Sequence, residues 1–207
     1  MNEVSNPWLS QPVASQTRAS TESAVPSSAV AHGPRAPQRG IPVPDRVDRL
    51  PTRDHQFAAD LWLLGAHGGA GESSLSELVP QWRPSGHSWP RVPGHPLRSR
   101  VLLTARSNVR GLRAAQSATT QWAAGLAPFV DLVGLVIVAD APGKTPRPIR
   151  ELTQLVSGGA PRTWHVPWIE SWRLGDPVAL ESAPRPVRRL VDDLQTVLAS
   201  GATGTSI

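Results

Sequence analysis

The sequence contains no cysteine and no long hydrophobic run, and these two absences exclude several classes of protein. Without cysteine the chain can form neither a disulfide framework nor a thiolate metal site. The longest apolar run, LVGLVIVA at residues 132–139, is far shorter than the roughly 18 residues that a transmembrane helix needs. The first residues also lack a basic start followed by an apolar stretch, so we expect no secretory signal. These features predict a cytoplasmic protein with no membrane contact, and the heavy use of Ala, Arg, Pro and Gly with a single Lys suggests a GC-rich bacterial source.

Acidic residues are absent from a long central stretch of the chain. Between Glu77 and Asp131 there is no aspartate or glutamate. The same stretch contains seven arginines, which are Arg83, Arg91, Arg98, Arg100, Arg106, Arg110 and Arg113. Two interpretations stay open, a surface that binds nucleic acid or another polyanion and an ordinary solvated arginine-rich surface. The candidate residues for polyanion contact are Arg91, Arg98 and Arg100, which lie in or beside a predicted loop.

The first 58 residues differ in composition from the rest of the chain. They are rich in Ser, Ala and Pro and show no sustained period of 2 or 3.6 residues. Such a composition is typical of segments that cannot bury enough apolar surface to fold. The sequence therefore predicts a disordered tail over residues 1–58, a folded domain over 59–200 and a flexible end over 201–207.

Short apolar runs alternate with helical patterns from Leu61 onward. Four runs have strand character: LWLL at 61–64, RVLLTA at 100–105, DLVGLVIVAD at 131–140 and TWHVPW at 163–168. Helical patterns follow each of them, and the clearest, at 187–198, repeats its apolar residues at helical spacing. The segment 83–100 is crowded with Pro and Gly, and we expect it to be a loop. This alternation predicts a small three-layer α/β domain, with a mostly parallel sheet of about four strands and flanking helices.

A glycine-rich stretch, GAHGGAGESSL at residues 65–75, follows the first predicted strand. Phosphate-binding loops need glycines so that backbone N–H groups converge on phosphate, a lysine for charge, and a Ser or Thr for magnesium. The candidate residues of such a loop are Gly65, His67, Gly68, Gly69, Gly71, Glu72, Ser73 and Ser74. The strict pattern G-x-x-x-x-G-K-[ST] is broken twice, because Ala66 replaces its first glycine and Glu72 its lysine.

The segment HGGAGESS at 67–74 resembles the deviant phosphate loop K-G-G-x-G-K-[ST]-[ST] of the MinD/ParA group of P-loop ATPases. The positions that match are Gly68, Gly69, Gly71, Ser73 and Ser74. His67 and Glu72 stand where the family has its two lysines. The resemblance continues to the C-terminal half, where WHVPWIESWRLGDPV at 164–178 is similar to a late segment of the family. The positions that match there are Pro167, Gly175, Pro177 and Val178.

This resemblance implies a P-loop NTPase-like fold whose family cofactor is ATP with magnesium. It places Asp140 and Pro167 at the corner that recognises the base. The family carries further strands, including the Walker B strand, between its phosphate loop and its late strands. Here only the short acid-free stretch separates them, so we expect no Walker B carboxylate, no catalytic residue, no metal site and no cofactor. Weak binding of ATP and magnesium is the alternative.

Glu72 has a second consequence for any phosphate ligand. A carboxylate about 4 Å from a phosphate charge is repelled by roughly 4 kcal/mol at an effective dielectric constant near 20. An arginine from elsewhere could replace the missing lysine, or it could pair with Glu72 and fill the site from within. The arginines that we consider for this role are Arg106, Arg147 and Arg173. We favour the filled, nucleotide-free site.

The sequence thus favours a non-catalytic adaptor or regulator that acts through a protein partner it does not identify. The resemblance suggests a partitioning, conjugation or other mobile-element system. Two alternatives stay open, a weak or partner-completed ATPase and a nucleic-acid-binding accessory protein. Trp168 and Trp172 can contact such a partner or pack in the core, since tryptophan is typical of both places. His87 and His95, with no carboxylate near them in the sequence, are interpreted as exposed loop histidines.

Overall fold

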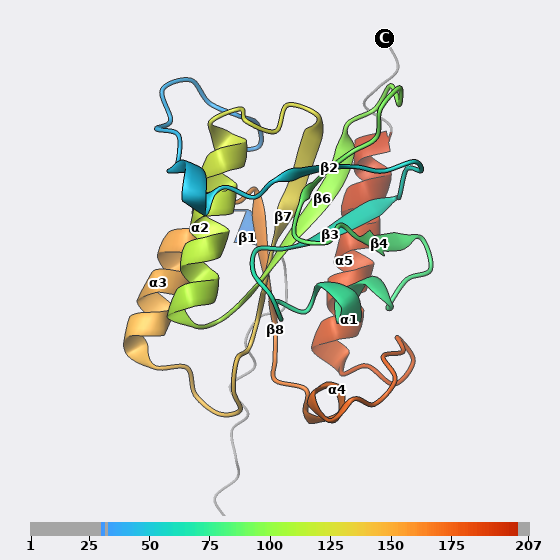
Figure 1. The fold of residues 1–207 in the computed structure, drawn as a ribbon. Helices are drawn as coiled ribbons and strands as arrows, with labels where there is room; N and C mark the ends of the chain where they lie inside the picture. The colour runs from blue at the N-terminus through green and yellow to red at the C-terminus, as the bar shows by residue number, and fades with distance from the viewer. Residues whose placement is uncertain (1–29, 32, 203–207) are drawn as a thin grey trace, which may run out of the picture.

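Six strands form the main sheet of the computed structural model, which describes residues 30–31 and 33–202 (Figure 1). Five of them are parallel, in the spatial order β8 (Arg162–Val166), β7 (Val130–Val138), β6 (Ser99–Arg106), β3 (Leu61–Gly65) and β4 (Trp82–Pro84). β1 (Val30–Ala31) adds an antiparallel edge beside β8. The prediction of an α/β fold with a mostly parallel sheet is confirmed, while the predicted number of four strands is too low.

Helices cover both faces of this sheet, which explains why its central strands are apolar along their length. The helices α1 (Glu72–Ser76) and α5 (Arg185–Ala202) lie on one face, and α2 (Val109–Ala123) and α3 (Arg147–Ser157) on the other (Figure 1). Successive side chains of β3 alternate between the two layers. Leu61 and Leu63 pack toward α1 and α5, whereas Trp62 and Leu64 pack toward α2.

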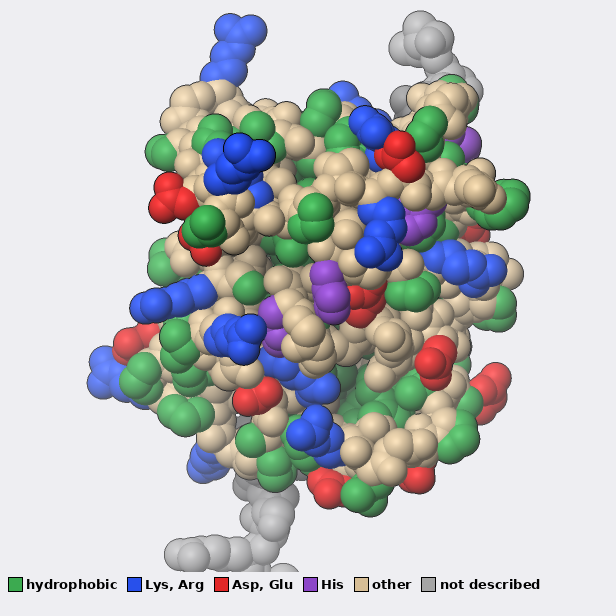
Figure 2. Space-filling model, in the orientation of Figure 1, with side chains coloured by type: hydrophobic (Ala, Val, Ile, Leu, Met, Phe, Trp, Pro, Cys, Tyr) green, Lys and Arg blue, Asp and Glu red, His purple; other side chains and the backbone are tan. Residues whose placement is uncertain are grey.

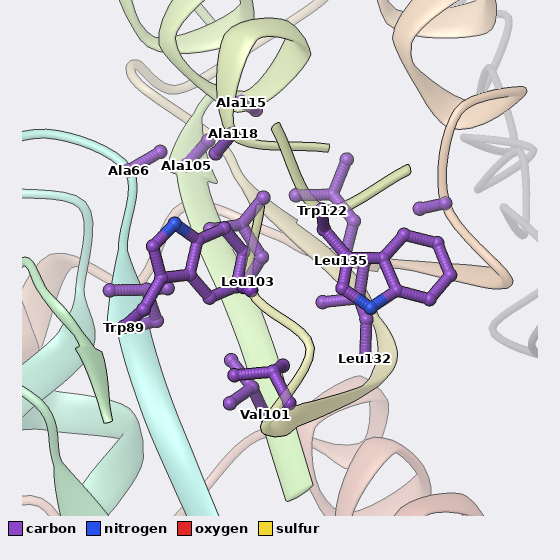
Figure 3. Packing of buried hydrophobic residues seen from close by; sticks show 14 of the residues in the cluster. Ala66, Trp89, Val101, Leu103, Ala105, Ala115, Ala118, Trp122, Leu132 and Leu135 are labelled. Carbon is purple, nitrogen blue, oxygen red and sulfur yellow. The ribbon is translucent and has the colours of Figure 1, made fainter. Parts of the chain in front are cut away.

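Small and large side chains interlock under α2. Ala115 and Ala118 of α2 are fully buried, and their short side chains let the helix lie close to β6 (Figure 3). The indole rings of Trp89 and Trp122 lie on either side of Leu103, and both are almost completely buried (Figure 3). Trp89 comes from outside the main sheet, so a residue of a connecting segment completes this core.

The Pro- and Gly-rich segment 83–100 is more than the loop that its composition predicts. Its first residues belong to β4, and it contains β5 (Trp89–Arg91), which pairs in parallel with β2 (Thr52–Asp54). The N–H group of Trp89 donates to Pro51 O at 2.8 Å. Burial of the Trp89 side chain holds this segment on the domain. The strand that pairs with β5 is β2, which comes from much earlier in the chain. No local sequence pattern therefore indicates the pair.

Several residues before position 59, among them Gln38, Leu50 and His55, contact the folded domain. The 3-10 helix η1 (Arg46–Asp48) packs beside α2. The Gln121 side chain accepts from Leu50 N and donates to Leu50 O, both at 2.9 Å. The predicted disorder of residues 1–29 and 32 concerns positions outside the described residues. At the other end α5 continues to Ala202, and residues 203–207 of the predicted flexible end are likewise outside the described range.

The order of the strands places a topological switch between β3 and β6. From β3 the chain passes through α1 to β4 on one side, and from β6 it passes through α2 to β7 on the other. In open parallel sheets, ligands bind at the carboxyl ends of the strands at such a switch. In the described part of the chain, no helix is long and apolar enough to cross a membrane.

Candidate functional site at the carboxyl ends of the strands

The glycine-rich loop runs from the end of β3 to the start of α1, as the sequence predicts. Gly69 and Gly71 have φ angles of 76° and 93°, in the left-handed region that glycine adopts without strain. Gly68 lacks a positive φ, and a Cβ atom added there would meet no atom within 4 Å. The backbone therefore requires glycine at 69 and 71, but not at 68.

Glu72 begins α1 with its side chain buried and its carboxylate fully engaged within the chain. The residue is only 6% exposed. Its Oε2 atom accepts a hydrogen bond from Gly65 N at 3.1 Å, and its Oε1 atom accepts one from Gly86 N at 2.5 Å. Two backbone N–H groups thus stabilise the carboxylate at the position where a phosphate loop needs a lysine.

The side chain that faces Glu72 is a histidine rather than one of the arginines considered above. His87 Nδ1 lies 3.1 Å from Glu72 Oε2 and 3.0 Å from Gly65 O. Because a carbonyl oxygen only accepts, Nδ1 carries a proton and donates toward both oxygens. His87 is an exposed loop histidine, as interpreted from the sequence, with 46% of its side chain exposed, but it also contacts Glu72. The sequence signals only a turn at Gly86 and His87, and a turn signal does not say which residues the turn contacts.

His67 and Arg106 close the other side of the loop. His67 Nε2 accepts from Arg106 N at 3.1 Å, and its Nδ1 donates to Gly68 O at 2.8 Å. The Arg106 side chain donates to Gly69 O through Nε and to Ala139 O through Nη1, each at 2.9 Å. Arg106 therefore fastens the loop to the end of β7, although it does not touch the carboxylate of Glu72.

The other two arginines considered as partners of Glu72, Arg147 and Arg173, do not form an ion pair with it. Arg147 forms an ion pair with Glu151 one turn further along α3, with Nε and Oε1 2.7 Å apart. Arg173, in α4 (Glu170–Leu174), lies near Arg106 instead. Burial lowers the pKa of the Arg106 guanidinium; the negative charge of Asp140 opposes this shift, and the positive charge of Arg173 adds to it.

A cavity of about 110 Å³ lies beside the loop, between α1 and α4. Ser74, Pro167 and Trp168 are among the residues that line it. Asp140 is not among its lining residues, and its backbone N–H donates to Ser107 Oγ at 3.0 Å. Ser73 is exposed to solvent. The cavity is smaller than pockets for drug-sized ligands, which measure about 300–1,000 Å³.

The three candidate arginines for polyanion contact have different surroundings. Arg91 binds Asp54 through two hydrogen bonds, of 2.6 and 2.9 Å. Arg100 donates to Leu198 O, near the end of α5, at 3.2 Å. Arg98 is exposed. Two of the three guanidinium groups therefore already bond within the chain.

Comparison with known proteins identifies a family but no function. A family model described as "Family of unknown function (DUF6668)" matches residues 59–191, the region from just before β3 into α5. No curated protein and no solved structure matches the chain. The matched region covers more than half of the 207 residues and includes the whole glycine-rich loop. The chain therefore belongs to this family of unknown function, DUF6668.

Proposed function

We propose that this chain is a degenerate, MinD/ParA-like P-loop domain that acts as a non-catalytic adaptor or regulator. The fold assignment is supported by the strand, glycine loop and helix at the switch between β3 and β6. It is also supported by the residues of 67–74 that match the deviant phosphate loop. A role in a partitioning, conjugation or other mobile-element system rests on that resemblance alone.

The observation that carries the proposal is the set of hydrogen bonds around Glu72. Its carboxylate is held by the N–H groups of Gly65 and Gly86, with His87 beside it. A lysine at this position would supply positive charge to a phosphate, whereas the buried carboxylate repels one. The partners of Glu72 come from the chain itself, so the loop keeps its shape without a ligand.

The neighbouring groups support the same conclusion. His67, at the position of the family's first lysine, uses both ring nitrogens for contacts within the chain. Arg106 donates its side-chain hydrogen bonds to the carbonyl groups of Gly69 and Ala139. The half-buried Trp168 and Trp172 and the exposed Leu174 offer a surface to a protein partner at the same end of the sheet. Without nucleotide turnover, a protein contact is the function that this surface supports best.

Calorimetric titration of the full chain with Mg-ATP and Mg-ADP tests the proposal. We expect no heat of binding at sub-millimolar nucleotide and no hydrolysis in a coupled phosphate assay. A dissociation constant in the micromolar range would overturn it and favour the weak or partner-completed ATPase. The Glu72→Lys variant provides a comparison, because any gain of phosphate affinity in it assigns the wild-type lack of binding to this residue.

A further inference from the structure

The cavity between α1 and α4 combines apolar walls with two arginines. Leu75, Val138 and Trp172 contribute apolar surface, while Arg106 and Arg173 contribute positive charge. Among the described residues, no carboxylate lines the cavity. Figure 2 shows hydrophobic side chains in a hollow on this face, between the regions of α1 and α4, with Lys or Arg side chains beside it.

The charge of the two arginines is not neutralised by an ion pair. Among the ion pairs formed by residues 30–31 and 33–202, none includes Arg106 or Arg173. Arg106 donates to carbonyl groups, which carry no net charge. Asp140 is the acidic group that acts on Arg106, and Glu170 accepts from Trp168 Nε1 at 2.5 Å. Two neighbouring guanidinium groups at an apolar cavity therefore favour a ligand that brings a carboxylate.

The size of the cavity limits what can enter it. At about 110 Å³ it has room for one side chain or a few water molecules, because a water molecule occupies about 30 Å³ in the liquid. Apolar side chains are also exposed near the cavity, since the lining residue Pro167 is exposed and Leu174, which follows Arg173 in α4, is 74% exposed. A larger partner that inserts one side chain and covers the rim fits this shape better than a free small molecule does.

We propose that this cavity docks an acidic segment of a partner protein. An aliphatic or aromatic side chain of that segment fills the space between Leu75, Val138 and Trp172, and a neighbouring carboxylate binds Arg106 and Arg173. Tryptophan and arginine are the residues that most often dominate the binding energy of protein interfaces. The inference rests on the proposed adaptor role and names the chemistry of its partner.

Selection of phage-displayed heptapeptides on the full chain tests this inference. We expect the enriched peptides to place an Asp or Glu next to a bulky apolar residue. Synthetic copies of these peptides should bind the Arg173→Glu variant at least about tenfold more weakly, which corresponds to about 1.4 kcal/mol. Trp172→Ala should also weaken binding, because it removes a wall of the cavity without changing the charge. Thermal melts of both variants show whether they fold.

Arg98→Glu is the matched control, since it makes the same charge reversal at an exposed arginine. Arg98 precedes the first residue of β6, while Arg106 ends that strand, so the two lie at opposite ends of the sheet. We expect this variant to bind the peptides within about twofold of wild type, because distant exposed charges are screened by salt.

Four results would overturn the inference: no enriched peptide, enriched peptides without acidic residues, equal binding to Arg173→Glu, or displacement of the peptides by millimolar ATP or phosphate. The last result would identify a small-anion site instead. If the peptides do not bind as expected and the calorimetric titration shows no nucleotide binding, the inference fails but the proposed function still stands. Nucleotide binding in the calorimetric titration would overturn the proposed function itself.

Discussion

His87 Nδ1 lies 3.1 Å from Glu72 Oε2, so the turn between β4 and β5 contacts the first residue of α1. The contact lies against the end of β3, because the Gly65 N–H also donates to this Oε2 atom and the Gly65 carbonyl accepts from His87. The glycine-rich loop is thus joined to another segment of its own chain.

Glu72→Gln should lower the free energy of unfolding by about 1–3 kcal/mol, the cost of leaving a buried polar group without its partner. The carboxylate accepts from two N–H groups with its two oxygens, whereas an amide has one oxygen and one NH₂ group. One N–H group would therefore face another donor. Urea denaturation measures the effect, and Glu77→Gln, at an exposed position, is the control. Equal stability of both variants would contradict the hydrogen bonds assigned to Glu72.

Gly65→Ala should also destabilise the chain by about 1–3 kcal/mol, as overpacking of a close contact does. A Cβ atom at this position would lie 2.7 Å from His87 Nδ1 and 2.8 Å from Glu72 Oε2, so both side chains or the backbone must shift. Gly68→Ala is the matched control in the same loop, because its Cβ would meet no atom within 4 Å. We expect the control to melt close to the wild-type temperature. If both alanine variants melted alike, the close approach at Gly65 would be refuted.

Arg106→Met should lower the free energy of unfolding by about 1–3 kcal/mol, because the carbonyl groups of Gly69 and Ala139 lose a charged donor. Methionine keeps much of the apolar stem and removes the guanidinium group. Arg110→Met, at an exposed position of α2, should change stability by less than about 0.5 kcal/mol. Chemical denaturation of the two variants separates a structural arginine from a surface one. If the Arg106→Met variant were as stable as wild type, the guanidinium group would not stabilise the fold, and its role would be limited to binding a ligand.

Gln121→Ala should speed tryptic cleavage of the segment 46–53 in the native chain. The variant loses both hydrogen bonds that hold Leu50 on α2, so this segment opens more often. Arg49 and Arg53 are trypsin sites within or beside it. Gln116→Ala, at an exposed position of the same helix, should be cleaved at the wild-type rate. Equally fast cleavage of the wild type would support the prediction of a disordered tail that reaches residue 58.

His55 should make stability fall at acidic pH. Burial lowers its pKa, the charge of Arg53 adds to this shift, and Asp54 opposes it. The folded-state pKa of His55 therefore lies below the ordinary value of about 6.5. The stability that the neutral ring contributes is fully present above about pH 6.5 and is lost as the pH falls through the folded-state pKa. The ring of His55 also lies 4.2 Å from that of Trp62, centroid to centroid.

The His55→Phe variant keeps an aromatic ring at this place and removes the titration. We expect it to lose less stability than wild type between about pH 7 and about pH 5, as measured by urea midpoints at both values. The two proteins differ in no other titratable group. An equal loss in the two proteins would rule out the contribution of His55.

Much of the fold could be predicted because its signals are local. The run at 131–140 is apolar at nearly every position, as a parallel strand covered on both faces requires, and β7 occupies most of it. The helix beginning at Val109 follows Asn108, whose side chain accepts from Gly111 N as a helix cap. The turn after β3 depends on glycines at positive φ, which a sequence pattern reveals directly.

The sequence by itself therefore determined four of the strands, β3, β6, β7 and β8, together with the turn after β3 and the carboxylate at residue 72. Only the tertiary structure decided what that carboxylate contacts, because Gly86 and His87 reach it through a segment without local periodicity. The same holds for β2 and β5, whose pairing depends on the buried Trp89 and on residues far earlier in the chain. Contacts of this kind arise when distant segments meet over a shared core, and no spacing of residues along the chain encodes them.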